Sequence, residues 1–258
     1  MGVIMLRRST RRLWCKTVLL STGICSLGLS AGIVVSLVLM RFAANDAQRY
    51  LAAGSQISAE QSVDVPDAPI FPVVDWESLH REHPEVIAWL SVPDTPVSLP
   101  IVAADVDRPF FYLTHDLEGR KNIYGCAYLD AACKGNVLAP NAVIYGHHSP
   151  DGAMFAPLSK YLDASWAKAH SQILLQTPTK KLRLRPVFVR VVNAAVEGPK
   201  LTFSDEQDFI AWYQDEFLRA DITIDNASSP NHVVSLVTCS YTSWSNERTV
   251  IYCIEGDA

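Results

Sequence analysis

The chain has 258 residues, of which 49% are hydrophobic and 19% are charged, and this length suffices for one large domain or two small ones. Residues 1–41 hold six of the 22 basic residues and none of the 27 acidic ones, which leaves 16 basic against 27 acidic residues in the rest of the chain. That remainder has a formal charge of −11. A domain this acidic repels a phosphate backbone, so we expect no nucleic-acid partner.

Residues 17–40 are the first predicted element, a run of 24 residues without a charge. As a helix, this run is about 36 Å long, enough to cross a hydrocarbon core of about 30 Å. The basic residues before it are Arg7, Arg8, Arg11, Arg12 and Lys16. The positive-inside rule therefore predicts a single-pass signal anchor in the cell membrane, with residues 1–16 in the cytoplasm and the rest of the chain outside. A cleaved signal peptide is the alternative, but its apolar core is usually shorter and no small-x-small cleavage site follows the run.

Residues 41–74 are predicted to be an extracytoplasmic stalk, because they are rich in Ala, Ser, Gln, Asp and Pro. The folded domain is predicted to span residues 75–258. It opens with short helical pieces over residues 75–92, which Pro84 interrupts. Strand-like apolar runs separated by turn residues follow, at 97–103, 124–130, 141–147, 172–177, 181–196, 232–239 and 248–254.

Helical stretches are predicted between these runs, at 151–163, 165–170 and 204–220. In the last stretch, Ser204 and Gln207 form a predicted capping box. Phe209, Tyr213 and Phe217 then recur at helical spacing. Many short strands with a few inserted helices indicate a mostly-β fold, a closed barrel or a sandwich with decorations. A parallel α/β sheet is less consistent with the sequence, because most links between the strands are too short for crossover helices.

Cys239 ends the apolar run 232–239 and precedes a polar loop, where a thiol can be partly exposed. Arg248 opens the next run, so a hairpin-like return would bring its guanidinium beside the thiol. His147 likewise follows an apolar run and a glycine, so the imidazole and the thiol meet if these two strands are neighbours. Cysteine and histidine are the minimal pair for nucleophilic acyl transfer, and an arginine can hold the oxyanion or the substrate carbonyl. His148 is the alternative to His147 that the sequence leaves open.

Three motifs of this chain resemble those of the sortases and follow one another in the family's order. "LVTC" at 236–239 resembles the family's Thr-Leu-x-Thr-Cys signature, with Ser235 in place of the first Thr. "YGHHSPDGAMFAPLSKY" resembles the segment that carries the sortase histidine, and Arg248 matches the family's arginine. The helical lead-in, "FFYLTHD", the Met-Phe pair after the histidine and the long helix before the cysteine are similar to class B in particular. No second apolar span follows and no lid segment precedes the domain, which argues against class C.

This resemblance implies an eight-stranded β-barrel and a cysteine transpeptidase. It implies that Cys239 is the nucleophile, His147 the general acid and base, and Arg248 the stabiliser of the tetrahedral intermediate. Further residues that match family positions near the substrate pocket are Tyr145, Thr238 and Leu113. No metal or organic cofactor is implied.

The implied partners are surface proteins or pilins whose sorting signal, of the Leu/Asn-Pro-x-Thr type, is cleaved after Thr, and an amine acceptor such as a peptidoglycan precursor or a pilin lysine. The signal preferred here stays open, because Pro109 stands where class B members often carry Asn and Ser240 stands where an acidic residue can occur. The alternatives are a tethered cysteine hydrolase and a non-catalytic extracytoplasmic binding or scaffold module. An L,D-transpeptidase is disfavoured because its histidine and cysteine lie close in sequence, whereas 92 residues separate His147 from Cys239.

The remaining cysteines of the predicted domain raise a separate question. Cys126 and Cys133 lie close in sequence, and an oxidising compartment would allow them to form a disulfide. Cys253, in the last strand-like run, is expected to be a small core residue on the inner face of its strand. No two cysteines have the close spacing of a zinc site.

Overall fold

The computed structural model describes residues 32, 34, 70–226, 229–239 and 246–256, and it describes Cys239 by its backbone alone. The chain divides into two compact units, Met1–Gln48 and Arg49–Ala258, and nearly all of the described residues belong to the second. Among the described residues, no helix has the length and apolar character that a bilayer span needs. The predicted anchor at 17–40 falls outside the described residues except at positions 32 and 34, so it stays a prediction.

The second unit is built around a barrel. Within the described residues, nine strands form one sheet in the order β5-β1-β2-β3-β4-β8-β9-β6-β7, and pairing of β5 with β6 closes all but β7 into a ring of eight. The strands are β1 (Val86–Ser91), β2 (Ser98–Ala103), β3 (Ala127–Leu129), β4 (Asn141–Tyr145), β5 (Ile173–Gln176), β6 (Lys181–Asn193), β7 (Ile222–Thr223), β8 (Val233–Cys239) and β9 (Glu247–Glu255). The predicted eight-stranded barrel is therefore confirmed.

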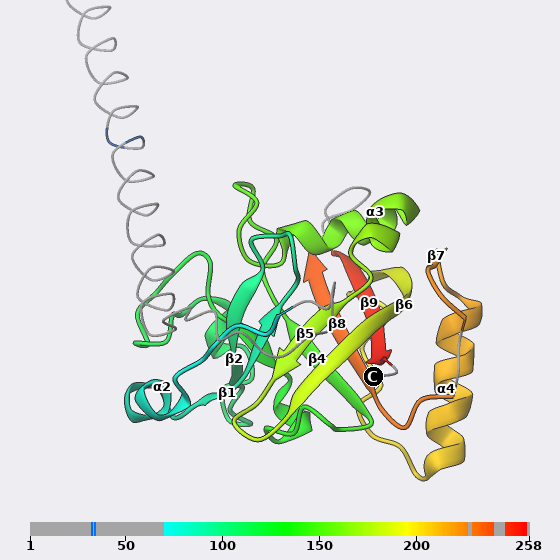
Figure 1. Cartoon of the computed structure of the whole chain (residues 1–258), viewed down its shortest axis with the longest axis horizontal. Coiled ribbons are helices and arrows are strands. Elements are labelled where there is room, and N and C mark those ends of the chain that lie inside the picture. Colours follow the sequence, from blue (N-terminus) through cyan, green and yellow to red (C-terminus); the bar gives the residue numbers. More distant parts are fainter. Residues whose placement is uncertain (1–31, 33, 35–69, 227–228, 240–245, 257–258) are drawn as a thin grey trace, which may run out of the picture. The chain divides into compact units, whose positions relative to one another are not determined.

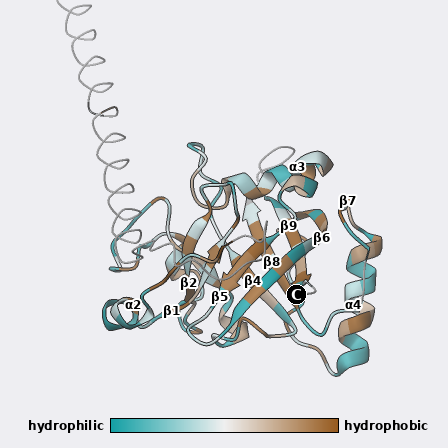
Figure 2. Cartoon of the chain, in the orientation of Figure 1, coloured by the Kyte–Doolittle hydropathy of each residue, from teal (hydrophilic) through white to brown (hydrophobic). Residues whose placement is uncertain are grey.

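Short helices decorate the barrel. They are α2 (Trp76–Glu82), α3 (Ala164–Ala169), α4 (Glu206–Leu218) and the 3-10 helices η1 (Phe111–Leu113), η2 (Ala131–Cys133) and η3 (Ala156–Leu162). Figure 1 shows α2 beside β1 and β2, and α4 alongside the part of the wall that β6 and β9 form. The barrel strands are mostly brown in the hydropathy view, whereas α4 alternates between apolar and polar residues (Figure 2). This alternation fits a helix that buries one side only.

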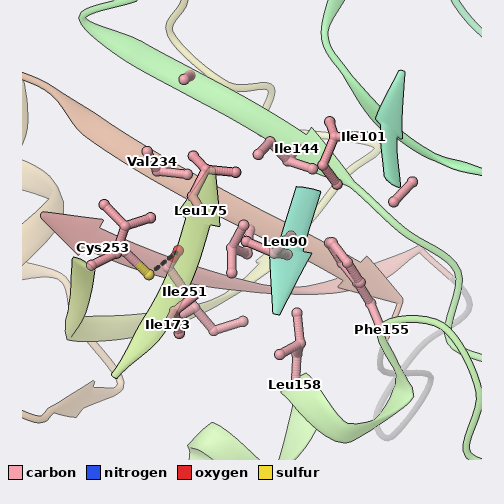
Figure 3. Close-up of a cluster of buried hydrophobic side chains, with 14 of the residues drawn as sticks. Leu90, Ile101, Ile144, Phe155, Leu158, Ile173, Leu175, Val234, Ile251 and Cys253 are labelled. Carbon is pink, nitrogen blue, oxygen red and sulfur yellow. Dashed lines mark hydrogen bonds between the residues drawn. The ribbon is translucent and has the colours of Figure 1, made fainter. Parts of the chain in front are cut away.

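The inside of the barrel is filled by aliphatic side chains from almost every strand. Figure 3 shows these side chains converging from strands and from η3; the labelled ones are Leu90, Ile101, Ile144, Phe155, Leu158, Ile173, Leu175, Val234, Ile251 and Cys253. All ten are buried. Cys253 is a small core residue at 0% exposure, as the sequence predicted. A closely packed interior of this kind holds the strand ends in fixed positions.

Alternate residues of the same strands point outward and form a second cluster under α4. On β8, Val234 and Leu236 belong to the inner core, whereas Val233 and Val237 belong to the outer cluster. From α4, residues at helical spacing pack against this wall, namely Phe209, Tyr213 and Phe217. Phe188 of β6 stacks on Tyr252 of β9 with ring centroids 4.3 Å apart. The side chains that the sequence placed at helical spacing are therefore the ones by which α4 packs against the outside of the barrel.

Two local predictions were wrong. The sequence predicts helical pieces throughout residues 75–92, but Val86–Ser91 is strand β1, which pairs with β2 and β5. An unbroken apolar run of this length suits a buried strand as well as a helix, and the pairing partners decide. The capping residue of α4 is Asp205, whose carboxylate accepts from the Asp208 amide, and not Ser204.

Candidate active site

The strands β4 and β8 run parallel and bring two strand ends to one level of the barrel. Asn141 pairs with Val233 and Tyr145 pairs with Val237. The ladder continues one step further, because the Gly146 amide donates to the Val237 carbonyl at 3.0 Å. Residue 147 and residue 239 each follow two positions after the last registered pair. The neighbouring strands that the sequence required for His147 and Cys239 are therefore present.

Gly146 is needed where β4 leaves the barrel. A Cβ atom at this position would lie 2.4 Å from the Phe155 ring, which is itself fully buried. Beyond the glycine, the Phe155 amide donates to the His147 carbonyl at 2.8 Å. The backbone of His147 is thus held between the end of β4 and a core aromatic residue, so only glycine fits before the histidine.

The imidazole of His147 contacts a backbone carbonyl from a distant segment. Its Nε2 lies 2.5 Å from the carbonyl oxygen of Leu113, 34 residues earlier in the chain. A carbonyl oxygen only accepts hydrogen bonds, so Nε2 carries a proton here. In the neutral imidazole, Nδ1 is then the atom left without a proton, and it is the one able to accept one.

Leu113 is held in place by a second glycine. Gly125 has φ +54°, and a Cβ there would lie 2.2 Å from the Tyr112 carbonyl oxygen and 2.8 Å from that of Leu113. The next residue, Cys126, donates its amide to the Tyr112 carbonyl at 2.9 Å. The close approach of Gly125 therefore fixes the carbonyl that orients His147. Sequence reasoning named Leu113 as a residue of the substrate groove and missed this backbone role.

Cys239 lies directly opposite Arg248 in the antiparallel ladder between β8 and β9. This is the last registered pair at the carboxyl end of β8. The guanidinium of Arg248 is partly exposed and donates to its neighbour's carbonyl, that of Glu247, at 2.9 Å. The structure places the backbone of Cys239 but its side chain lies outside the described atoms. The register of the two strands brings the backbones of Cys239 and Arg248 side by side, as expected from a hairpin-like return of the chain.

A groove of about 490 Å³ runs along the outer wall from this level toward α4. The predicted site residues with described side chains that line it are Leu113, Tyr145, His147, Thr238 and Arg248. His148 lines a different cavity, beside α3, so the structure separates the two adjacent histidines. The groove has an exposed apolar rim, since Phe110 is 70% exposed and Leu113 is 37% exposed.

Comparisons with known proteins agree with this architecture. Sortase B of Listeria monocytogenes is 26% identical over 162 residues, 62% of this chain and 65% of the relative. Sortase B of Staphylococcus aureus is 22% identical over 165 residues, 64% of this chain and 67% of the relative. The solved structure of Clostridium perfringens sortase B matches with a TM-score of 0.63 and 24% identity, over 70% of this chain and 99% of that one. No family model matches the chain.

The chain resembles the class B sortases in sequence and in fold. The chain spans 65% and 67% of the length of the two curated sortases B.

Tyr145 and Thr238, two of the predicted groove residues, differ in the hydrogen bonding of their hydroxyls. The hydroxyl of Tyr145 donates to Asp130 at 3.1 Å, and burial raises the pKa of Tyr145 above its ordinary value. Thr238, next to Cys239, is 1% exposed, and its hydroxyl has no hydrogen-bond partner among the described residues. Tyr145 therefore stays protonated over the physiological range and acts in the groove as a hydrogen-bonding, aromatic surface.

An ion-pair network, which sequence reasoning missed, lies where the groove meets α4. Arg190 of β6 contacts Glu216 of α4 at 2.6 Å and Glu197 at 3.0 Å. The hydroxyl of Tyr252 also donates to Glu216, at 2.9 Å. Arg190 and Glu216 are only 8% and 9% exposed in their side chains. The one sequence signal was an arginine at an apolar position of the run 181–196, and its acidic partner could not be read from the sequence.

The described cysteines other than Cys239 are free thiols. Cys126, Cys133 and Cys253 are buried and unpaired, so the disulfide that the sequence left open between Cys126 and Cys133 is absent here. Burial raises the pKa of each of these thiols above its ordinary value. Such thiols are poor nucleophiles, because the reactive species is the thiolate.

Proposed function

We propose that this chain is a cysteine transpeptidase of the class B sortase type. The proposal assigns Cys239 as the nucleophile, His147 as the general acid and base, and Arg248 as the stabiliser of the oxyanion. One observation carries it: parallel β4 and antiparallel β9 flank β8, so the three residues reach one level of the barrel at the head of a groove. The likeness to two curated sortases B supports the same reaction class.

In the first half of the proposed reaction, the Cys239 thiolate attacks a peptide carbonyl carbon while the imidazole of His147 carries the proton. A carbon–sulfur bond forms, and the negative charge on the carbonyl oxygen lies beside the Arg248 guanidinium. The carbon–nitrogen bond then breaks as His147 gives a proton to the leaving amine. The product is a thioester on Cys239, and the covalent intermediate splits one difficult exchange into two easier steps.

In the second half, an incoming amine attacks the thioester and loses its proton to His147. The new amide forms and the thiolate leaves, so the enzyme returns to its starting state. The contact between Nε2 and the Leu113 carbonyl leaves Nδ1 of His147 for both proton transfers. A fixed tautomer keeps the same nitrogen directed at the reaction in both halves.

The proposed substrates are surface proteins with a C-terminal sorting signal of the Leu/Asn-Pro-x-Thr type, cleaved after Thr. The proposed acceptor is the amine of a peptidoglycan precursor or of a pilin lysine. An extended peptide suits the groove, because its rim is apolar at Phe110 and Leu113 while its floor carries hydrogen-bonding groups. The predicted anchor at residues 17–40 would hold the enzyme at the outer face of the membrane, where secreted substrates and lipid-linked acceptors meet.

The experiment that tests this function separates transfer from hydrolysis. The full chain, purified in detergent, is incubated with a pool of Leu/Asn-Pro-x-Thr peptides, with and without an added primary amine, and the products are identified by mass spectrometry. Transpeptidation predicts cleavage after Thr and a product that carries the amine. His147→Asn removes the acid and base and is expected to reduce turnover by about 10²- to 10⁴-fold. Cleavage in which water is the acceptor even with excess amine would assign a tethered cysteine hydrolase instead.

A further inference from the structure

One wall of the groove is a connecting segment whose first part is exposed and whose last part packs against the core clusters. We call residues 194–203 the strap; they connect β6 to the turn before α4. Its stretch from Ala194 to Pro199 is exposed throughout. The strap contributes Glu197, Lys200 and Leu201 to the lining of the groove. Leu201 and Phe203 pack against the core, but the exposed stretch buries little apolar surface, so polar contacts must fix where that stretch lies.

A pair of buried polar side chains supplies one of these contacts. Asn141 of β4 is 1% exposed and Ser235 of β8 is 2% exposed, and both line the floor of the groove. The Asn141 amide nitrogen donates to the Lys200 carbonyl oxygen at 2.9 Å. The Ser235 hydroxyl donates to the amide oxygen of Asn141 at 2.7 Å.

The chemistry of the three groups permits only one arrangement. The Lys200 carbonyl can only accept, so the nitrogen of the Asn141 amide must be directed at it. The amide oxygen then lies toward Ser235, whose hydroxyl must donate. Without that hydroxyl, a buried amide oxygen would lose its partner and the amide orientation would no longer be specified.

Lys200 extends this connection to α4. Its ammonium group contacts Asp208 in the first turn of the helix at 2.5 Å and lies 5.0 Å from the centroid of the Phe203 ring. The Lys200 backbone is thus tied to the barrel while its side chain is tied to α4. The exposed stretch of the strap is held by Glu197, which pairs with Arg190.

We propose that Ser235 and Asn141 are positioning residues that, through the Lys200 carbonyl, set the place of the strap and so the width of the groove. Neither residue takes part in the chemistry at Cys239. The expected effect on substrate rests on the proposed function. If the groove binds a peptide, loosening the strap weakens peptide binding and leaves the chemical step intact. The expected signature is a rise in KM with little change in kcat.

The test compares three variants of the full chain in detergent with a matched control. Ser235→Ala removes the hydroxyl, Ser235→Thr keeps it, and Asn141→Leu removes the amide without adding a buried charge. Ser98→Ala is the control, because it removes from β2 a hydroxyl that accepts one hydrogen bond, from Trp89 of β1, away from the strap. Hydrogen exchange of the peptide covering 194–203 is measured first, since it requires no substrate. Steady-state kinetics with the preferred sorting peptide follow.

Ser235→Ala and Asn141→Leu are expected to speed exchange in the strap by about tenfold, the equivalent of one buried hydrogen bond. They are also expected to raise KM by about three- to tenfold with kcat within twofold. Ser235→Thr and Ser98→Ala should match the parent chain in both measurements. Unchanged exchange in the strap of both disruptive variants would overturn the inference. Faster exchange in a chain that turns over no peptide at all would uphold the positioning role and reject the proposed function.

Discussion

The imidazole Nε2 of His147 and the carbonyl oxygen of Leu113 lie 2.5 Å apart, although 34 residues separate them in sequence. This contact connects the groove rim to the proposed acid and base. It makes Nε2 a donor and leaves Nδ1 for proton transfer. Since the contact uses a backbone atom of residue 113, it depends on the path of the chain at 112–113 and not on the leucine side chain.

Gly125→Ala is predicted to disturb His147 from a distance. A Cβ at 125 would lie 2.2 Å from the Tyr112 carbonyl oxygen, so the 112–113 backbone must shift away. We expect kcat/KM to fall by about tenfold or more, because the tautomer and position of the imidazole are no longer held. The pH–rate profile of the variant should also shift, since it reports the acid and base.

Gly135→Ala is the matched control for this variant. Gly135 also has a positive φ, +74°, but a Cβ there would meet nothing nearer than 3.9 Å. Both variants carry the strain of a left-handed alanine, about 1–2 kcal/mol. Equal losses of activity in the two variants would show that backbone strain alone, and not the Leu113 carbonyl, accounts for the effect.

Gly146→Ala is predicted to damage both stability and activity. The added methyl would overlap the Phe155 ring inside the core, with the nearest ring atom 2.4 Å away. Overpacking of this kind costs about 1–3 kcal/mol in the free energy of unfolding. Urea unfolding measures that loss. Gly198→Ala is the stability control, because a Cβ at 198 has no neighbour within 4 Å; a loss as large in this control would refute the steric explanation.

The Arg190–Glu216 pair predicts a large difference between two acidic residues on one helix. Glu216→Gln removes the negative charge closest to a buried arginine, and breaking a buried ion pair costs about 3–5 kcal/mol. Asp215→Asn removes a carboxylate that is 61% exposed and pairs with Arg219, at a cost of about 0–1 kcal/mol. Chemical unfolding of both variants should rank them in this order. Similar losses would mean that the network does not hold α4.

Buried thiols predict weaker folding at alkaline pH. The pKa of Cys253 is raised by burial above its ordinary value of 9.0. From about pH 9 upward the unfolded chain loses this proton while the folded chain keeps it, so the free energy of unfolding falls as pH rises, by up to about 1.4 kcal/mol per unit. Cys253→Ala should flatten the pH dependence between 9 and 10, whatever its effect on absolute stability. An unchanged slope would show that the thiol ionises in the folded state.

The strand pattern alone left a barrel or a sandwich open, and the resemblance to the sortases predicted the eight-stranded barrel that the structure has. The same residues led to the proposal of three site residues, which stays a prediction. The sequence indicated these site residues because each stands where an apolar run meets a polar segment; they are Cys239, His147 and Arg248. They lie close together only if the strands that carry them are neighbours in the sheet. The parallel pairing of β4 with β8 supplies that neighbour relation. Cys253 was placed correctly because a cysteine in an apolar alternating strand is most often a core residue.

Other features depend on contacts between distant segments and could not be read from the chain. The run at 86–91 was predicted as helix because an apolar stretch of six residues has no decisive period, and only its pairing with β2 and β5 identifies it as a strand. The partners of Arg190, and the hydrogen bonds from Ser235 through Asn141 to Lys200, join residues that are up to 94 positions apart. Side-chain chemistry names possible partners, but the fold selects among them.

The most direct test of the central proposal is intact mass spectrometry of the full chain after incubation with the sorting peptides, with Cys239→Ala as the control. We expect an acyl adduct on the parent chain alone, released faster by an added amine than by water, and its mass would identify the preferred signal. Absence of an adduct with every peptide, together with resistance of Cys239 to alkylation, would contradict the transpeptidase proposal and favour a non-catalytic binding module.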